Sequence, residues 1–241
     1  MTEKKYTVPI YNRIIRATLR PIFRGLFHIL SRVSIIGREN IPKKEAYLIA
    51  INHVSLFEPP FVLAFWPVAP EAAGAVDIWS RPFQSLLARL YGGIQIHRGE
   101  YDRQIIDTML SVLNSGRSLL IAPEGGRSHA LGMRRALPGV AYLIDRAKVP
   151  VIPVGIVGAT DDFLSKALRG KRSNIEMRIG KPMHLPPIEG QGRARRLSRL
   201  SIADQIMHQI AVLLPPEYHG VYKDETTREH SQETGCGNST T

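Results

Sequence analysis

Cysteine, long uncharged apolar runs and acidic residues are all scarce in this chain of 241 residues. Its single cysteine, Cys236, excludes an intramolecular disulfide framework and any zinc site built from several cysteines. Because Cys236 lies in a polar tail, it is also a poor candidate for a catalytic nucleophile. The chain is therefore expected to work in a reducing compartment.

No apolar stretch reaches the roughly 18 uncharged residues that a membrane-spanning helix requires. The most apolar N-terminal segment is interrupted by arginines before it reaches that length. The N-terminus also lacks a charge-free apolar core followed by a small-residue cleavage site. We therefore expect neither a membrane span nor a secretory leader.

Acidic residues number 21 against 32 lysines and arginines, which gives a formal charge of +11. Such an excess favours an anionic partner: nucleic acid, a membrane surface or a phosphorylated substrate. A nucleic-acid binder would need exposed aromatics that stack on bases, or a recognition helix. The cations here accompany an apolar helix face instead, so no nucleic-acid partner is expected.

Residues 8–33 have the pattern of an amphipathic helix, with apolar side chains on one broad face and arginines on the other. Residues 1–44 hold ten basic and two acidic residues, a net charge of +8. Anionic lipid would attract them by about 1 kcal/mol per basic residue near the surface. Pro21 should kink or divide the helix. The side chains expected at a membrane interface are Arg13, Arg16, Arg20, Arg24, Phe23 and Phe27.

The alternative for this N-terminal segment, residues 1–34, is an ordinary amphipathic helix packed on the protein's own core. Beyond it, apolar runs that predict buried strands alternate with segments of helical period. Strands are expected at 46–51, 94–98, 118–122, 151–157 and 174–180, and helices at about 83–90, 101–114, 138–148, 161–169 and 197–214. The run 61–66 is expected to be a buried helix or a second patch near the membrane.

Strands that alternate with helices of about ten residues predict an α/β fold with a mixed, largely parallel sheet flanked by helices. This domain is expected to span residues 35–222. Residues 223–241 are polar and nearly free of large apolar side chains, so a disordered tail is expected there.

The stretch 52–60 directly follows the strand predicted at 46–51. His53 could act as a general base if a carboxylate oriented it, and Glu58 follows five positions later. On one regular helix the two residues would point about 140° apart. They can meet only if His53 lies in a turn and Glu58 in the structure after it. The alternative is a helix-capping Asn52 or Ser55 with a polar histidine nearby.

Two further polar clusters follow the ends of predicted strands. One is Gly92-x-x-Gln95-Ile96-x-Arg98, and the other runs from Pro123 through Glu124 and Gly125 to Arg127 and Ser128. Ligands of open α/β sheets bind outside the carboxyl ends of strands, so the clusters could converge. Each alone could be a surface charge or a tight turn. Together they offer a base, an orienting acid and arginines for phosphate.

These motifs resemble the glycerolipid acyltransferase family, typified by 1-acylglycerol-3-phosphate acyltransferase. Four family blocks occur in order: Asn52-His53-x4-Glu58, Gly92 to Arg98, Pro123 to Ser128, and the apolar run 149–154. The chain departs from the family pattern at four positions. Glu58 replaces an aspartate, Gln95 a phenylalanine, Ala122 a phenylalanine and Gly126 a threonine.

The resemblance implies that His53 takes the proton from a glycerol hydroxyl as that oxygen attacks an acyl thioester. Glu58 would hold the imidazole in the right tautomer, as the acid does in a catalytic triad. Arg98 and Arg127 would bind the acceptor's phosphate. The residues implied to position the substrate are Asn52, Ser55, Glu124, Gly125 and Ser128.

The implied donor is acyl-CoA or acyl carrier protein, with no metal or organic cofactor because the thioester is already activated. The implied acceptor is lysophosphatidic acid, on a peripheral (monotopic) enzyme at the cytoplasmic face of the cell membrane, in contact with anionic lipid. Two alternatives stay open. One is an acyltransferase for another lysolipid, such as lyso-ornithine lipid, and the other is an anionic-membrane-binding protein without catalysis.

Overall fold

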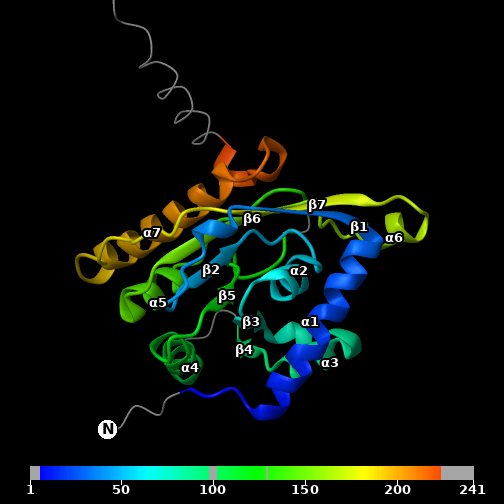
Figure 1. The fold of residues 1–241 in the computed structure, drawn as a ribbon. Helices are drawn as coiled ribbons and strands as arrows, with labels where there is room; N and C mark the ends of the chain where they lie inside the picture. The colour runs from blue at the N-terminus through cyan, green and yellow to red at the C-terminus, as the bar shows by residue number, and fades with distance from the viewer. Residues whose placement is uncertain (1–5, 98–101, 129, 224–241) are drawn as a thin grey trace, which may run out of the picture.

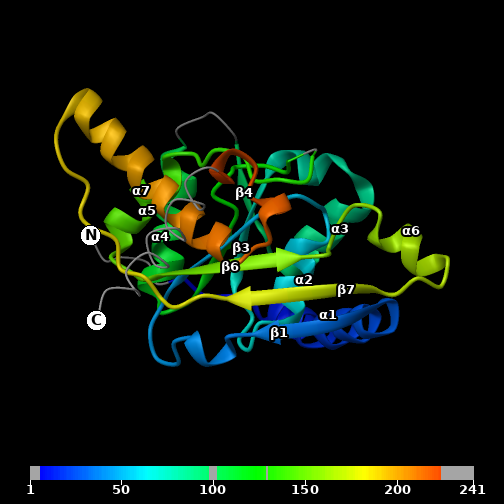
Figure 2. The ribbon, with the colours of Figure 1, turned by 90° about the horizontal axis from the view of Figure 1, so that it is seen from above.

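The computed structural model describes residues 6–97, 102–128 and 130–223. The strands in these residues are β1 (Ser31–Ile36), β2 (Leu48–Ile51), β3 (Glu71–Ala75), β4 (Ile94–Ile96), β5 (Leu119–Ile121), β6 (Val151–Val157) and β7 (Ser173–Ile179). They form one sheet in the order β1-β7-β6-β2-β5-β3-β4 (Figure 1). Every pair is parallel except β6 and β7, whose arrows point in opposite directions in Figure 2. The predicted mixed, largely parallel sheet is confirmed.

Helices cover both faces of this sheet. The described residues form α1 (Ile10–Leu30), α2 (Glu58–Phe65), α3 (Pro82–Tyr91), α4 (Arg103–Asn114), α5 (Gly139–Ala147), α6 (Phe163–Leu168) and α7 (Gly192–Val212). Figure 1 shows α4, α5 and α7 on one side of the sheet and α1, α2 and α3 on the other.

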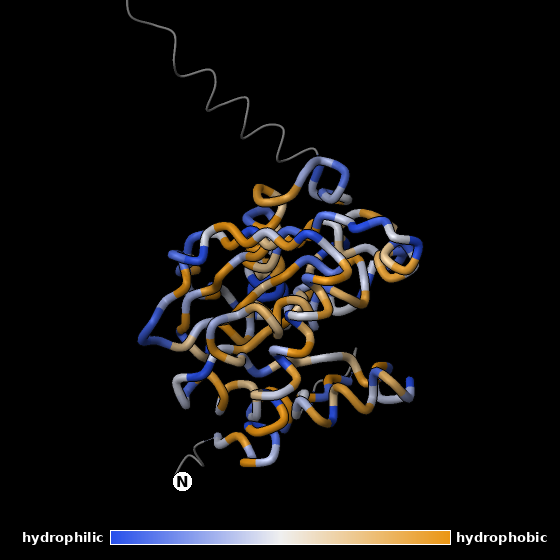
Figure 3. Tube along the Cα trace, turned by 45° about the vertical axis from the view of Figure 1, so that its right-hand side comes forward, coloured by the Kyte–Doolittle hydropathy of each residue, from blue (hydrophilic) through white to orange (hydrophobic). Residues whose placement is uncertain are grey.

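The central strand β2 shows why both faces need helices. Its four residues are all apolar and almost fully buried. Leu48 and Ala50 pack with the cluster under α4, α5 and α7, whereas Ile49 and Ile51 pack with the cluster under α1, α2 and α6. Alternate residues of a strand point to opposite faces, so a continuous apolar run predicts a strand covered on both sides. Figure 3 shows orange hydrophobic segments alternating with blue hydrophilic ones along the trace.

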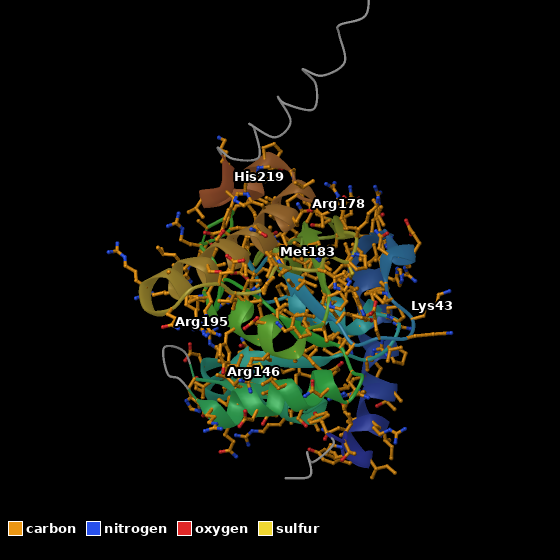
Figure 4. The ribbon with its side chains drawn as sticks, turned by 90° about the vertical axis from the view of Figure 1, so that its left-hand side faces the viewer. Lys43, Arg146, Arg178, Met183, Arg195 and His219 are labelled. Atoms are coloured by element: carbon orange, nitrogen blue, oxygen red, sulfur yellow. The ribbon has the colours of Figure 1, made fainter. Side chains whose placement is uncertain are left out.

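The chain after β7 ties α7 to the sheet (Figure 4). Arg178 of β7 donates to the carbonyl oxygen of Leu213, just past α7, at 2.9 Å. Met183 and Val151 exchange two backbone hydrogen bonds of 2.8 and 2.9 Å. These contacts fix the C-terminal end of α7 beside β6.

The N-terminal helix differs from its prediction in extent. α1 is a single helix that contains Pro21 and ends at Leu30, and the chain then enters β1 rather than continuing as a helix to residue 33. Pro21 removes the N–H that would bond to the carbonyl of Ala17. Both residues face outward, where water can satisfy that carbonyl. Of the predicted kink or division at Pro21, the division is therefore wrong.

The arginine face of α1 is turned toward the protein. Arg16 is 3% exposed, and its guanidinium bonds both oxygens of the buried Glu71 carboxylate at 2.8 and 2.6 Å. Its Nε donates to the carbonyl of Tyr91, whose ring it also covers. Burial alone would raise the pKa of Glu71, but Arg16 and Arg117 outweigh it and lower that pKa. The pair anchors α1 to β3.

Two further arginines of α1 bind the end of α2. Arg20 donates to the carbonyl of Leu63 at 2.9 Å, and Arg24 donates to the carbonyl of Ala64 at 2.6 Å. The last carbonyls of a helix lack partners within the helix and carry the negative end of its dipole, so cations stabilise them.

The expectation that Arg16 and Phe27 lie at a membrane interface was therefore wrong. Phe27 is buried among Phe61, Phe65 and Phe163, and Arg16 is buried against Glu71. Arg20 and Arg24 are partly buried, with their bonds directed into the protein. A helical projection separates two faces but does not tell which one turns inward.

The opposite face of α1 is apolar and exposed. Ile10, Ile14, Ile22 and Ile29 are each more than half exposed, with values of 74, 62, 56 and 70%. Over the described residues, no helix combines the length and apolarity needed to cross a bilayer. The structure therefore presents an uncharged apolar stripe along an otherwise anchored helix.

Two smaller differences remain. β3 is a strand of small residues that the sequence did not predict. α7 begins at Gly192, five residues before the start predicted at about 197. The predicted disordered tail lies outside the described residues from position 224 onward.

Candidate active site

The carboxyl ends of β2, β5 and β6 meet at one edge of the sheet, because these three strands are parallel neighbours. His53 follows β2 by two residues, and Glu124 follows β5 by three. The Ser128 N–H donates to the carbonyl of His53 at 2.8 Å. The Asn52 side chain bonds both the N–H and the carbonyl of Ile156 in β6, at 2.8 and 3.0 Å. Hydrogen bonds thus join all three strand ends.

His53 and Glu58 meet across the turn that opens α2. His53 lies in the turn, Glu58 is the first residue of the helix, and Nδ1 of His53 lies 3.0 Å from Oε2 of Glu58. This is the only arrangement in which residues five apart could meet, as the sequence had indicated. The His53 side chain is 14% exposed, whereas Glu58 is fully buried.

The Glu58 carboxylate is held by three further donors. Oε1 accepts from the N–H of Val54 at 3.1 Å and from Nδ2 of Asn52 at 3.3 Å, and Oε2 accepts from the N–H of Ser55 at 3.1 Å. Burial raises the pKa of Glu58 well above its usual range, although the two backbone N–H groups oppose this rise. The position at a helix N-terminus also favours negative charge there.

This environment defines what the histidine can do. A carboxylate that accepts from Nδ1 keeps the ring proton on that nitrogen, so Nε2 is the basic atom. The fixed carboxylate also holds the plane of the ring and stabilises an imidazolium when one forms. This geometry gives the pair what an oriented general base requires.

Glu124 acts on the main chain around His53. It is 2% exposed, and Oε1 accepts from the N–H of His53 at 2.8 Å while Oε2 accepts from the N–H of Arg134 at 2.7 Å. Burial raises its pKa to about 7, against the opposing effect of these two N–H groups. Both oxygens are engaged with the backbone, so Glu124 fixes the main chain at His53.

The other predicted positioning residues also support the loops. Ser55 is buried, and its hydroxyl donates to the carbonyl of Ala159 while accepting from the N–H of Phe57. Gly125 has a φ of +69°, and an added Cβ would lie 2.2 Å from Cδ1 of Leu137. Only glycine fits there.

Arg127 lies at the same edge but has a partner that the motifs had not indicated. Its Nη1 lies 3.3 and 3.4 Å from the carboxylate oxygens of Asp161, which follows β6. Asp161 belongs to none of the four blocks. The only signal that could have found it is its position just after the apolar run that forms β6. The second predicted phosphate ligand, Arg98, lies outside the described residues.

Other polar features lie apart from this edge. A cavity of about 220 Å³ between α5 and α7 is lined by residues that include Asp145, Lys148 and His184. Figure 4 labels Arg146 and Arg195 on that side. His219 is buried and bonds the carbonyl of Leu214, so its role is structural. In the part of the chain that the structure describes, no three His, Cys, Asp or Glu side chains are grouped to hold a metal ion.

Comparison with known proteins agrees with this fold. An acyltransferase family model matches residues 32–157, which is more than half of the chain. The chain therefore belongs to the acyltransferase family, as its four motifs predict.

Two curated relatives and one solved structure specify the likeness. A lyso-ornithine lipid O-acyltransferase of Pseudomonas aeruginosa is 29% identical over 189 residues, covering 71% of this chain and 69% of its own. A 1-acyl-sn-glycerol-3-phosphate acyltransferase of Borreliella burgdorferi is 22% identical over 139 residues, covering 57% of this chain and 56% of its own. The crystal structure of the acyltransferase PlsC from Thermotoga maritima shares the fold, with a TM-score of 0.57 and 20% identity over 81% of this chain and 79% of that one.

The pKa of Glu124 leads to a prediction about stability. The folded chain holds this proton more tightly than the unfolded chain, because burial raises the pKa from 4.5 to about 7. The resulting stabilisation is complete below about pH 4.5 and is lost as the pH rises through about 7. Between pH 5 and pH 8, Glu124 should lower the free energy of unfolding by about 2 kcal/mol.

Urea unfolding of Glu124→Gln at the two pH values measures this contribution. In this variant the free energy of unfolding should fall by about 2 kcal/mol less between pH 5 and pH 8 than in the wild type. The variant also loses one hydrogen bond at both pH values, because Gln offers a single oxygen to two donors. Glu189→Gln, at an exposed carboxyl, is the control and should keep the wild-type decrease. An unchanged decrease in Glu124→Gln would contradict the assignment.

Proposed function

We propose that this chain transfers a fatty acyl group from an acyl thioester to the free hydroxyl of a lysolipid. The observation that carries the proposal is the 3.0 Å contact between Nδ1 of His53 and the buried carboxylate of Glu58. That contact orients a base at a strand end where ligands of α/β sheets bind.

The reaction needs one base and no acyl-enzyme intermediate. Nε2 of His53 takes the hydroxyl proton as the acceptor oxygen attacks the thioester carbon, and Glu58 stabilises the imidazolium. The tetrahedral intermediate then collapses, the C–S bond breaks, and the imidazolium returns the proton to the leaving thiolate. The products are an ester and a free thiol. The thioester is already activated, so the proposal requires no metal or organic cofactor.

The donor carries its acyl chain on coenzyme A or on acyl carrier protein. Both present the same thioester to His53, and the chain's formal charge of +11 suits either anionic carrier. The donor thus enters the proposal only as an acyl thioester.

The first candidate acceptor is 1-acylglycerol 3-phosphate, which would yield phosphatidic acid for phospholipid synthesis. Arg127 supports this choice, because a guanidinium matches the oxygens of a phosphate. The second candidate is lyso-ornithine lipid, the substrate named for the relative that is 29% identical. The carboxylate of Asp161 beside Arg127 favours this acceptor, because ornithine carries an ammonium group.

Replacing the base tests the proposed chemistry. With detergent-dispersed acceptor and an acyl thioester, His53→Ala should lower kcat for thiol release by about 10²- to 10⁴-fold, the range typical of general-base catalysis. His184→Ala, at the cavity between α5 and α7, is the matched control and should retain wild-type release. If neither candidate acceptor supports release above the His53→Ala level, for several chain lengths and both donors, the proposal fails.

The location we propose is the cytoplasmic face of the cell membrane, with the outer face of α1 lying in the bilayer interface. The exposed isoleucines of α1 would enter the lipid, and the exposed Arg13 would meet anionic headgroups. The inward-facing arginines act differently from the prediction, since they brace the helix against α2 and β3.

Flotation with vesicles that contain anionic phospholipid tests this orientation. The double variant Ile14→Glu and Ile22→Glu should lose most of its vesicle-bound fraction, because two carboxylates would have to enter the apolar layer. Its thiol release with detergent-dispersed acceptor should stay near the wild-type rate.

The control places the same charges on α7, at the exposed Leu197 and Val212. That double variant should float as the wild type does. If both double variants float to the same extent as the wild type, the proposed membrane face is wrong.

A further inference from the structure

Two opposite charges lie together next to the proposed base. Arg127 reaches Asp161 at 3.3 Å, and the side chains are 22% and 60% exposed. We call these two residues the Arg127–Asp161 pair. The motifs account for the arginine but not for the carboxylate, so the role of Asp161 needs an explanation.

The backbone holds both charges beside the His53–Glu58 turn. Ser128, next to Arg127, donates its N–H to the carbonyl of His53 at 2.8 Å. Oδ1 of Asp161 accepts from the N–H of Leu56 at 3.2 Å. Leu56 lies between His53 and Glu58 in the chain, so each charge is tied to the turn that carries the base.

Electrostatics agrees with this closeness. Burial is the main cause of the raised pKa of Glu58, and Asp161 raises that pKa further while Arg127 lowers it. Both members of the pair therefore act on the carboxylate that orients His53. An acceptor whose hydroxyl reaches His53 would bring its headgroup to these two charges.

The contact between Arg127 and Asp161 can break at little cost when a ligand binds. The Asp161 side chain is 60% exposed, and an ion pair open to water contributes little to stability, typically about 0–1 kcal/mol. A headgroup with an anion alone would gain Arg127 but would approach the carboxylate of Asp161. A headgroup with an anion and an ammonium group could replace both halves of the pair. Attraction of one kind of headgroup and repulsion of another together produce specificity.

We infer that Asp161 selects acceptors whose headgroup carries an ammonium group beside its anionic group. The best match is an amino-acid-headed lysolipid, with its carboxylate on Arg127 and its ammonium on Asp161. This inference rests on the proposed acyl transfer and names the acceptor class for that same site. The chemical step is unchanged.

The variant Asp161→Asn tests the charge of this side chain separately from its structural hydrogen bond. Asparagine keeps an oxygen that can accept from the N–H of Leu56, but it loses the negative charge. We compare kcat/KM for lyso-ornithine lipid and for lysophosphatidic acid of matched chain length, with one acyl thioester. The value for lyso-ornithine lipid should fall at least about tenfold, the scale of one charged hydrogen bond, and the value for lysophosphatidic acid should hold or rise.

Asp162→Asn is the matched control. Asp162 is the adjacent carboxylate, but it bonds Lys166 and Thr160 rather than Arg127. This variant should keep the wild-type ratio of the two kcat/KM values. Asp161→Glu, which restores the charge, should recover part of the preference.

The outcomes separate this inference from the proposed function. Transfer to both acceptors with the same ratio in wild type and Asp161→Asn would overturn the role of Asp161 and leave the acyltransferase proposal standing. If the wild type transfers an acyl group to neither acceptor, both the role of Asp161 and the acyltransferase proposal are overturned. If the ratio of the two kcat/KM values shifts toward lysophosphatidic acid in Asp161→Asn but not in Asp162→Asn, the result supports selection by Asp161.

Discussion

The buried carboxylate of Glu58 is the constraint on which the site depends. A carboxylate removed from water is costly unless donors satisfy it, and here Val54, Ser55, Asn52 and His53 all point to it. Satisfying that charge dictates the turn between β2 and α2. The same requirement therefore shapes the loop, places Glu58 at the start of α2 and orients the ring of His53, the proposed base. Glutamate stands where the family pattern has an aspartate, at the first turn of α2, and its Oε2 lies 3.0 Å from Nδ1 of His53.

The supporting contacts extend this constraint to the rest of the sheet. Asn52 bonds β6 as well as Glu58, and Glu124 after β5 binds the N–H of His53. Three parallel strands thus contribute to the position of one imidazole. On the other side, Arg20 and Arg24 of α1 stabilise the far end of α2. The helix that carries Glu58 is consequently held at both ends, and the apolar face of α1 is left outward.

Much of this arrangement could be predicted from the sequence, and the failures have physical causes. The apolar run that forms β2 and the motif around His53 are local patterns, so they predict the strand, the turn and the meeting with Glu58. β3 was missed because its small residues have low strand propensity, and pairing with β4 and β5 decides its structure. The inward arginines were missed because their partners, such as Glu71, lie far away in the chain. Asp161 has no local signature and joins the site only through the position of β6.

The kcat of Glu58→Gln tests the central claim most directly. A glutamine of the same length offers one oxygen and one amino group where four donors now converge, so the ring of His53 loses both its acceptor and its fixed tautomer. The account predicts that thiol release falls by about 10²-fold or more, as when a triad loses its orienting acid, while circular dichroism shows a folded chain. A folded Glu58→Gln enzyme with the wild-type kcat would contradict it.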